Sequence, residues 1–175
     1  MGNEKPLVGI VLGSKSDMEQ AEKISAILDE LSIVHEVTVA SAHRTPEDVA
    51  AYSTRARTRG IKVIIAVAGL SAALPGTIAA HTILPVIGVP AVSGTLGGMD
   101  ALLAIAQMPP GVPVATVGIN GGRNAALLAA RIMAVYDEKI FNTLSEWTLK
   151  ASEKTSLDRT TLEGLPSAPA EAFEI

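Results

Sequence analysis

Residues 7–31 read LVGIVLGSKSDMEQAEKISAILDEL, a stretch that passes from an apolar run through a polar turn into a helical pattern. The run 7–12 is apolar apart from Gly9, which is typical of a parallel strand covered by helices on both faces. The helical part places its apolar side chains close to i, i+3, i+4, i+7 spacing, at Ala21, Ile24, Ile27, Leu28 and Leu31. This stretch therefore predicts a strand, a loop and a helix in that order.

The same order recurs along the chain. Further apolar runs predict strands at residues 34–40, 62–68, 85–89 and 113–119. Helical patterns lie between and after them, at residues 46–59, 76–82, 98–107 and 123–136. Pro46 and Gly60 mark the two ends of the first of these helices. Strands that alternate with helices form a parallel sheet, so we expect a three-layer α/β/α domain whose ligands bind where the strands end.

The pattern changes after Tyr136. Residues 137–154 predict one more helix, with a sparse apolar stripe at Phe141, Leu144 and Trp147. This stripe could pack on its own domain or on a second subunit, and the sequence favours neither. Residues 155–175, with their prolines and scattered acids, predict an irregular tail. The expected organisation is a single α/β domain over 1–154, which includes this C-terminal helical extension, and a tail at 155–175.

Composition excludes several classes of protein. The 175-residue chain has no cysteine, which excludes disulfides, thiolate metal sites and a thiol nucleophile. Its net charge is −4, without a basic run, which argues against nucleic acid as a partner. It lacks an apolar run of about 18 residues, and its first 13 residues do not resemble a signal peptide. We therefore expect a cytoplasmic protein with no membrane partner.

Two of the expected strand-end loops carry functional groups. Ser14, Ser16 and Asp17 follow the first strand and open a helix, an arrangement that suits an anion but also simply caps helices. After the second strand comes His43, whose imidazole can gain and lose a proton near neutral pH, with a reference pKa of about 6.5. Beside it, Arg44 offers a planar fork for phosphate or carboxylate. Together these groups suggest a small phosphorylated substrate and proton-transfer chemistry.

The remaining loops are less informative. The loop 66–76 has small residues that let the backbone approach a planar ligand, although a buried turn would look the same. Glycines and hydroxyls of the loop 93–100 could close over a ligand, although we favour a turn that caps the next helix. The loop 120–124 has a glycine pair but lacks the spacing of a dinucleotide-binding motif. His35 and His81 are interpreted as packing residues. Histidines and acids lack the spacing of metal ligands, so no metal site is expected.

Taken in order, these loops resemble the catalytic component of phosphoribosylaminoimidazole carboxylase. The similarity runs from Val8 to Trp147 and rests on residues 13–17, 41–46, 69–76, 84–90, 107–109 and 124–130. The resemblance implies a flavodoxin-like sheet, a homo-octamer, and neither metal nor organic cofactor. In the common bacterial form it implies a mutase of purine biosynthesis, which converts 5-(carboxyamino)imidazole ribonucleotide into 4-carboxy-5-aminoimidazole ribonucleotide. The carboxyl group leaves as CO2 and is recaptured at the neighbouring ring carbon.

The resemblance also implies roles for individual residues. His43 would protonate the departing nitrogen and later remove the proton from the ring carbon, which requires a pKa near the working pH. Ser14, Asp17 and Arg44 would hold the ribose 5-phosphate. The rest of the pocket would come from Ser16, Ser41, Ala42, Gly69, Leu70, Ser71, Ala72 and Leu74.

One loop departs from the mutase pattern. The mutase form usually reads GGAAHLPG where residues 69–76 read GLSAALPG, so Ala73 replaces a second histidine. Ser71 and Ala73 look more like the branch that carboxylates aminoimidazole ribonucleotide directly with CO2, whereas Arg44, Pro46 and Pro75 favour the mutase. We predict the mutase. The alternatives are the direct carboxylase, a flavin- or nucleotide-binding module without catalysis, and an inactive relative.

Overall fold

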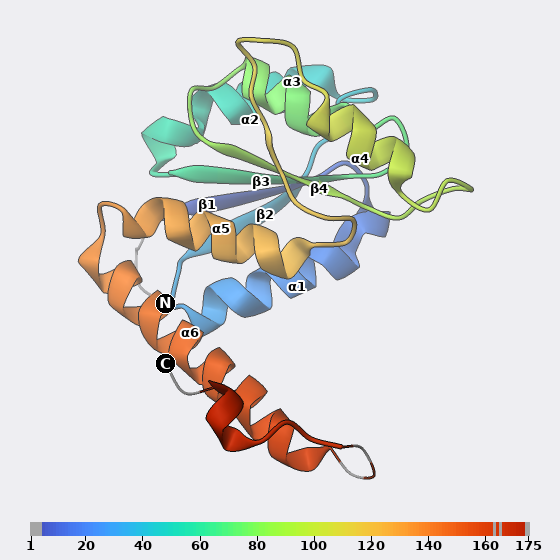
Figure 1. Cartoon of the computed structure of the whole chain (residues 1–175). Coiled ribbons are helices and arrows are strands. Elements are labelled where there is room, and N and C mark those ends of the chain that lie inside the picture. The colour runs from blue at the N-terminus through green and yellow to red at the C-terminus, as the bar shows by residue number, and fades with distance from the viewer. Residues whose placement is uncertain (1–4, 163, 165, 174–175) are drawn as a thin grey trace.

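The structure is a computed structural model that describes residues 5–162, 164 and 166–173. Residues 1–4 of the expected domain and residues 163, 165, 174 and 175 of the expected tail lie outside this described part. Figure 1 shows a central sheet with helices on both faces and one long helix that projects beyond the domain. Within the described ranges, no helix combines the length and the apolar character needed to span a bilayer.

The sheet has five parallel strands among the described residues, in the order β2-β1-β3-β4-β5. This is the flavodoxin-like order, as predicted. Val8 pairs with both His35 and Val63, so the first three strands run level and their following loops emerge at one edge. The strands are β1 (Val8–Leu12), β2 (His35–Val39), β3 (Val63–Ala68), β4 (Val86–Pro90) and β5 (Ala115–Thr116).

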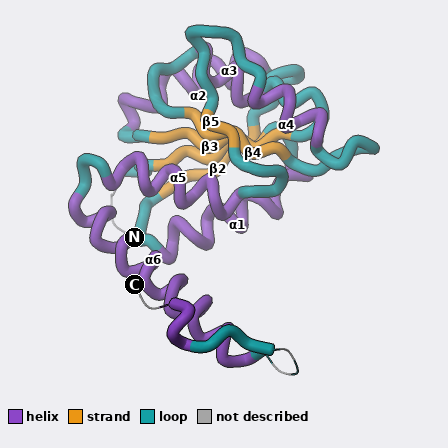
Figure 2. The backbone as a smooth tube through the Cα atoms, viewed as in Figure 1, coloured by secondary structure: helices purple, strands orange, loops and turns teal. Residues whose placement is uncertain are grey.

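Strand β5 is much shorter than the predicted run 113–119, as Figure 2 also shows. Pro113 has no amide hydrogen to donate to a neighbouring strand. Beyond the ladder, Val117 N still donates to Gly88 O at 3.1 Å. The chain then turns at Asn120, which has a φ of 57° and donates its amide to Pro90 O at 2.8 Å. The sequence thus predicted the right position in the sheet but too long a strand.

Helices cover the sheet on both faces, with α1 and α5 on one side and α2, α3 and α4 on the other (Figure 1). The side chains of β1 alternate between the two cores: Ile10 packs in the cluster with α1 and α5, and Val11 packs in the cluster with α2, α3 and α4. The helices are α1 (Met18–Glu30), α2 (Pro46–Arg59), α3 (Leu74–Ala80), α4 (Met99–Ala106), α5 (Gly122–Ala134) and α6 (Glu138–Asp158).

Helix α2 has the ends that the sequence predicted. Pro46 lies in its first turn, and Gly60 ends it in the left-handed region with a φ of 112°. Helix α3 begins at Leu74, before the predicted start at Gly76, because Pro75 is accommodated in the first turn, where an amide hydrogen is not needed.

Helix α6 packs on its own domain along one stripe and leaves another stripe uncovered. Asp137 caps its start by accepting a hydrogen bond from Ile140 N at 3.1 Å. Leu144 is 8% exposed in the core, and Trp147 Nε1 donates to Glu30 Oε2 on α1 at 2.8 Å. Phe141, which the predicted stripe includes, is instead half-exposed. Leu144 and Trp147 of the stripe therefore pack on this domain, while Phe141 stays half-exposed among the described residues.

Helix α6 also extends beyond its predicted end at Lys154. It continues to Asp158, so the first part of the expected irregular tail is helical. Short 3-10 turns follow at Arg159–Thr161 and Ala170–Phe173.

Candidate active site

Loops that follow β1, β2, β3 and β4 enclose one cavity of about 460 Å³ at the carboxyl edge of the sheet. All the residues predicted for the site contribute to its lining: Ser14, Ser16, Asp17, Ser41, Ala42, His43, Arg44, Gly69, Leu70, Ser71, Ala72 and Leu74. Their roles in binding and catalysis stay predictions. Their convergence follows from the parallel sheet, because segments far apart in sequence leave it at the same edge.

The turn after β1 is ordered by its own side chains. Ser14 N donates to Asp17 Oδ2 at 3.1 Å, and Ser16 N donates to Ser14 Oγ at 3.4 Å. Ser16 Oγ also lies 3.5 Å from Asp17 Oδ1 as a donor. Asp17 is only 8% exposed, and burial raises the pKa of its carboxyl, while these hydrogen bonds act to lower it. The turn is thus a helix cap that also presents a fixed carboxyl and two hydroxyls to the cavity.

The turn after β2 holds His43 at an exposed position. Ser41 and Thr45 close the turn: Ser41 N donates to Thr45 Oγ1 at 3.0 Å, and Thr45 N donates to Ser41 O at 2.9 Å. His43 lies between them and lines the cavity. Among the described residues, none forms a hydrogen bond or an ion pair with its ring. The imidazole is therefore accessible to a ligand in the cavity.

Arg44 connects this turn to the turn after β1. Its Nη2 donates to Gly13 O at 3.1 Å, and its Nε lies 3.4 Å from Ser41 Oγ. Of the acidic side chains that the structure describes, none pairs with this guanidinium. Arg44 thus keeps an uncompensated positive charge at the cavity, with its fork held in place by two neutral oxygens.

The turn after β3 supplies a wall of small residues. A Cβ added to Gly69 would lie 2.9 Å from Ser93 Cβ and 3.2 Å from Ala91 O, so only glycine fits between the two loops. Ala72 N donates to Gly69 O at 3.2 Å and closes the turn. Ala72 and Leu74 are buried, which gives this side of the cavity an apolar surface.

Ser93 also lines the cavity and was not predicted to do so. The sequence interpretation treated its loop as a turn that caps α4. The signal was present, since the Ser93 hydroxyl lies in the loop that follows β4 at Pro90, and β4 is the neighbour of β3. Gly13, Ala68 and Ala73 complete the lining through small side chains or the backbone.

The other two histidines lie away from the cavity and bond to the backbone. His35 Nδ1 is 3.1 Å from Ile33 O, and His81 Nδ1 is 2.8 Å from Thr77 O. The partly buried His35 agrees with the packing role expected of it, whereas His81 is exposed and does not pack in the core. Within the described part of the chain, histidine and acidic side chains do not gather into a group that could hold a metal ion.

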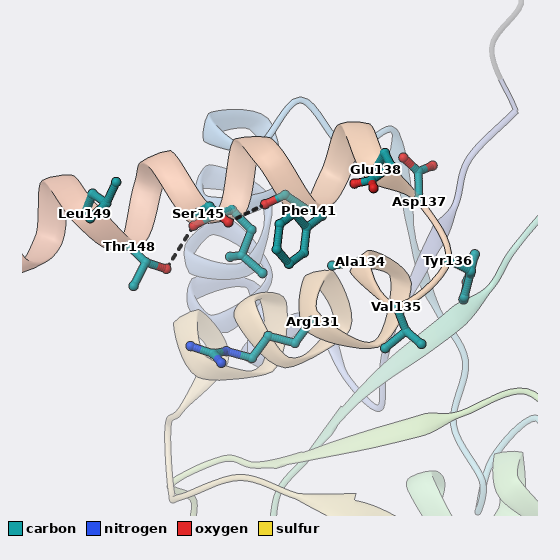
Figure 3. A pocket seen from close by; sticks show the side chains of 11 residues that line it. Arg131, Ala134, Val135, Tyr136, Asp137, Glu138, Phe141, Ser145, Thr148 and Leu149 are labelled. Atoms are coloured by element: carbon teal, nitrogen blue, oxygen red, sulfur yellow. Dashed lines mark hydrogen bonds between the residues drawn. The ribbon is translucent and has the colours of Figure 1, made fainter.

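A larger hollow of about 960 Å³ lies between α5 and α6 (Figure 3). Figure 3 shows the Phe141 ring directed toward Ala134 across this groove. Arg131, Asp137 and Glu138 are the charged residues at its border, and its lining includes no histidine. The groove therefore lacks the proton-transfer group that the smaller cavity has.

Comparisons with known proteins agree on one family. The family model described as AIR carboxylase matches residues 7–154. The N5-carboxyaminoimidazole ribonucleotide mutase of Bacillus subtilis is 56% identical over 144 residues, which cover 81% of this chain and 89% of that protein. The mutase of Pyrococcus horikoshii is 50% identical over 158 residues, 88% of this chain and 89% of that protein.

A second kind of relative is longer. The phosphoribosylaminoimidazole carboxylase of Saccharomyces cerevisiae is 49% identical over 159 residues, which are 91% of this chain but only 28% of that protein. Among solved structures, Treponema denticola PurE superposes with a TM-score of 0.82 at 34% identity, covering 91% of this chain and 99% of that one. The matched region contains all the loops around the small cavity.

Proposed function

The chain belongs to the AIR carboxylase family, and on that premise we propose that it converts 5-(carboxyamino)imidazole ribonucleotide into 4-carboxy-5-aminoimidazole ribonucleotide in purine biosynthesis. The reaction is an isomerisation, because the carboxyl group moves from the exocyclic nitrogen to the neighbouring ring carbon. The observation that carries the proposal is His43, which has no hydrogen-bond partner in the described part of the chain, in a cavity that also holds the Arg44 guanidinium and the Ser14–Asp17 turn.

His43 moves the proton in both halves of the reaction. The bond between nitrogen and the carboxyl carbon breaks, CO2 departs, and the nitrogen takes a proton from the imidazolium. The ring carbon then attacks CO2, and the neutral imidazole removes the proton from that carbon. The proton that His43 gives to the nitrogen is replaced by the proton that it takes from the ring carbon, so one histidine serves as acid and then as base. The reaction as written consumes no reductant, oxidant or cofactor.

The ribonucleotide is held by the polar side of the cavity. Arg44 binds the phosphate, since none of the described acidic side chains neutralises its charge and its fork matches anionic oxygens. The Asp17 carboxylate accepts a hydrogen bond from a ribose hydroxyl, and Ser14, Ser16 and Ser41 add hydroxyl contacts. The backbone from Gly69 to Ala72, with Ala42 and Leu74, forms the wall against which the flat imidazole lies.

CO2 is a free intermediate in this scheme, and its recapture needs a site that excludes water. The buried Ala72 and Leu74 supply apolar surface at the third loop. We infer that the CO2 released from the nitrogen stays beside this wall until the ring carbon attacks it.

We also infer that the chain forms a homo-octamer in the cytoplasm. Met99 and Leu103 are large apolar side chains that stay exposed on α4, which favours self-association. Sedimentation velocity of the purified protein measures the assembly directly. A monomer at micromolar concentration would contradict it.

Direct carboxylation of aminoimidazole ribonucleotide is the second candidate. It is favoured by Ser71 and Ala73 in the third loop and by the name of the yeast relative. The two activities are separated by offering the purified protein each substrate in turn. We expect rapid turnover of the carboxyamino compound and slow turnover of aminoimidazole ribonucleotide with bicarbonate. The reverse result would replace the mutase by the carboxylase.

A further inference from the structure

Leu70 has a backbone conformation that leucine disfavours. Its φ is 55°, in the left-handed region, where a bulky side chain is an outlier and glycine is the usual residue. The side chain is 52% exposed and lines the small cavity, so burial in the core does not explain the conformation. A strained residue at a ligand cavity persists because the surrounding structure over-determines it, and it points to a role there.

The Leu70 side chain lies against the loop after β4. A Cβ added to Gly94 would be 2.9 Å from Leu70 Cδ2, so the methyl group rests on the Gly94 backbone. The residues that precede Leu70 and Gly94, which are Gly69 and Ser93, also lie in close contact. Successive residues of the two loops therefore meet side by side, and Leu70 is the large apolar group in this contact.

The loop that Leu70 touches is built to adapt. Gly94, Gly97 and Gly98 all have positive φ values, of 64°, 60° and 87°. A Cβ at Gly97 would meet nothing within 4 Å, so the middle of this loop is open to solvent. The contact with Leu70 therefore adds to the hydrogen bonds that hold the start of this loop, Ala91 N to Ala68 O and Val92 N to Asn120 Oδ1.

We propose that Leu70 is a positioning residue that closes the gap between the loops after β3 and β4 and so retains CO2 in the cavity. This inference rests on the mutase function proposed above. CO2 is small, uncharged and weakly solvated, and the group best suited to block its path to water is an apolar side chain across the opening. The mutase form usually has glycine at this position, so closure by the Leu70 side chain is proposed as a feature of this chain. The left-handed backbone turns this side chain onto Gly94.

Escape of CO2 has a distinct chemical signature. When CO2 is retained, each substrate molecule yields one carboxylated product. When CO2 escapes, the nitrogen has already taken its proton from His43, and aminoimidazole ribonucleotide leaves as the product while CO2 is hydrated to bicarbonate. The ratio of aminoimidazole ribonucleotide to carboxylated product therefore measures leakage, independently of the overall rate.

The experiment compares full-length wild type, Leu70→Gly, Leu70→Met and Leu96→Ala. Each is given the carboxyamino substrate in ¹³C-bicarbonate, with the rate in the absence of enzyme subtracted. We expect Leu70→Gly to raise the leakage ratio about tenfold, which corresponds to a barrier to escape lowered by about 1.4 kcal/mol. Label in the carboxylated product should rise with it. Leu70→Met keeps an apolar side chain of similar length and should restore low leakage.

Leu96 provides the matched control, because it is an exposed leucine of the loop after β4 that does not line the cavity. Leu96→Ala should leave leakage at the wild-type level. An unchanged ratio in Leu70→Gly, or an equal rise in Leu96→Ala, would overturn the inference while the wild-type mutase activity stands. If wild type does not convert the substrate, the proposed function fails instead. Leu70→Ala, which keeps a Cβ, should give intermediate leakage and serves if the glycine variant is unstable.

Discussion

Two hollows of the molecule differ in the residues that line them, and the larger of the two is the less informative about function. The groove between α5 and α6, about 960 Å³, is bordered mainly by exposed parts of two helices. The cavity at the sheet edge, about 460 Å³, gathers a histidine, an arginine, an aspartate and several serines from loops distant in sequence. Converging chemical groups, more than volume, therefore identify a reaction site. The groove instead has the character of a contact surface.

The largest effect should come from the small cavity. His43→Asn removes the only proton-transfer group proposed there and should lower kcat by about 10²–10⁴-fold. Steady-state turnover of the carboxyamino substrate measures it. His35→Asn and His81→Asn are the controls, since both rings bond backbone carbonyls away from the cavity, and both should keep wild-type turnover. Full activity in His43→Asn would remove the proposed mechanism.

Substitutions in the groove between α5 and α6 should change the free energy of unfolding and not turnover. Leu144→Ala deletes a buried side chain of α6 and should lower the free energy of unfolding by about 2–5 kcal/mol. Leu149→Ala makes the same change on the same helix at a residue that is 64% exposed, and should cost about 0.5 kcal/mol or less. Urea denaturation of both variants measures the difference. Equal costs would show that another subunit covers Leu149 and would make the groove an interface.

A smaller effect is expected for the phosphate contact. Arg44→Ala removes a charge-assisted hydrogen bond to bound substrate and should weaken binding of the ribonucleotide by about 1.5–3 kcal/mol. Isothermal titration with the carboxylated product measures the affinity. Arg55→Ala on α2 is the matched control, because Arg55 lies outside the cavity and carries the same charge. Equal affinities for wild type and Arg44→Ala would exclude the phosphate role.

The smallest expected effect is on the pH dependence of the free energy of unfolding. Burial raises the pKa of Asp17 above 3.8, so in the interval between 3.8 and the raised value the folded chain binds more protons than the unfolded chain. The free energy of unfolding should therefore fall as pH rises through this interval and stay level above it. Urea denaturation across that interval should show this slope, and Asp17→Asn should abolish it.

Glu19 gives the opposite sign and serves as the control. Its ion pair with Lys23, 2.7 Å long, lowers the pKa of this exposed carboxyl below 4.5. Its contribution to stability should therefore rise with pH as the carboxyl ionises, and Glu19→Gln should remove only that rise. A common sign for Asp17 and Glu19 would mean that Asp17 is not held in a desolvated site.

The sequence predicted the fold well where local signals and packing agree. Helix α2 has the predicted ends because proline and glycine mark its first and last turns through backbone chemistry alone. Strand β5 was predicted too long because pairing at a sheet edge depends on what its neighbour offers, which apolar content does not record. The end of α6 was missed for a similar reason, since the residues after Lys154 have no strong stop signal.

The candidate site likewise has parts that the sequence predicts and parts that it does not. The loops that carry Asp17 and His43 could be placed together because parallel strands all end at one edge of the sheet. The contribution of Ser93 and the left-handed backbone of Leu70 could not be predicted, because both depend on how the loops after β3 and β4 meet. Contacts between loops depend on the folded arrangement of the chain and leave no periodic pattern in the sequence.

The tether between Arg44 and the Gly13 carbonyl has one more consequence. A side chain whose torsions are already fixed before ligand arrives loses little rotational freedom on binding, so more of the attraction appears as affinity. Lysine at this position would keep the charge but lose the planar geometry that lets one group grip a carbonyl and an anion together. The advantage of arginine here is thus entropic as well as electrostatic, and it is established before any substrate enters.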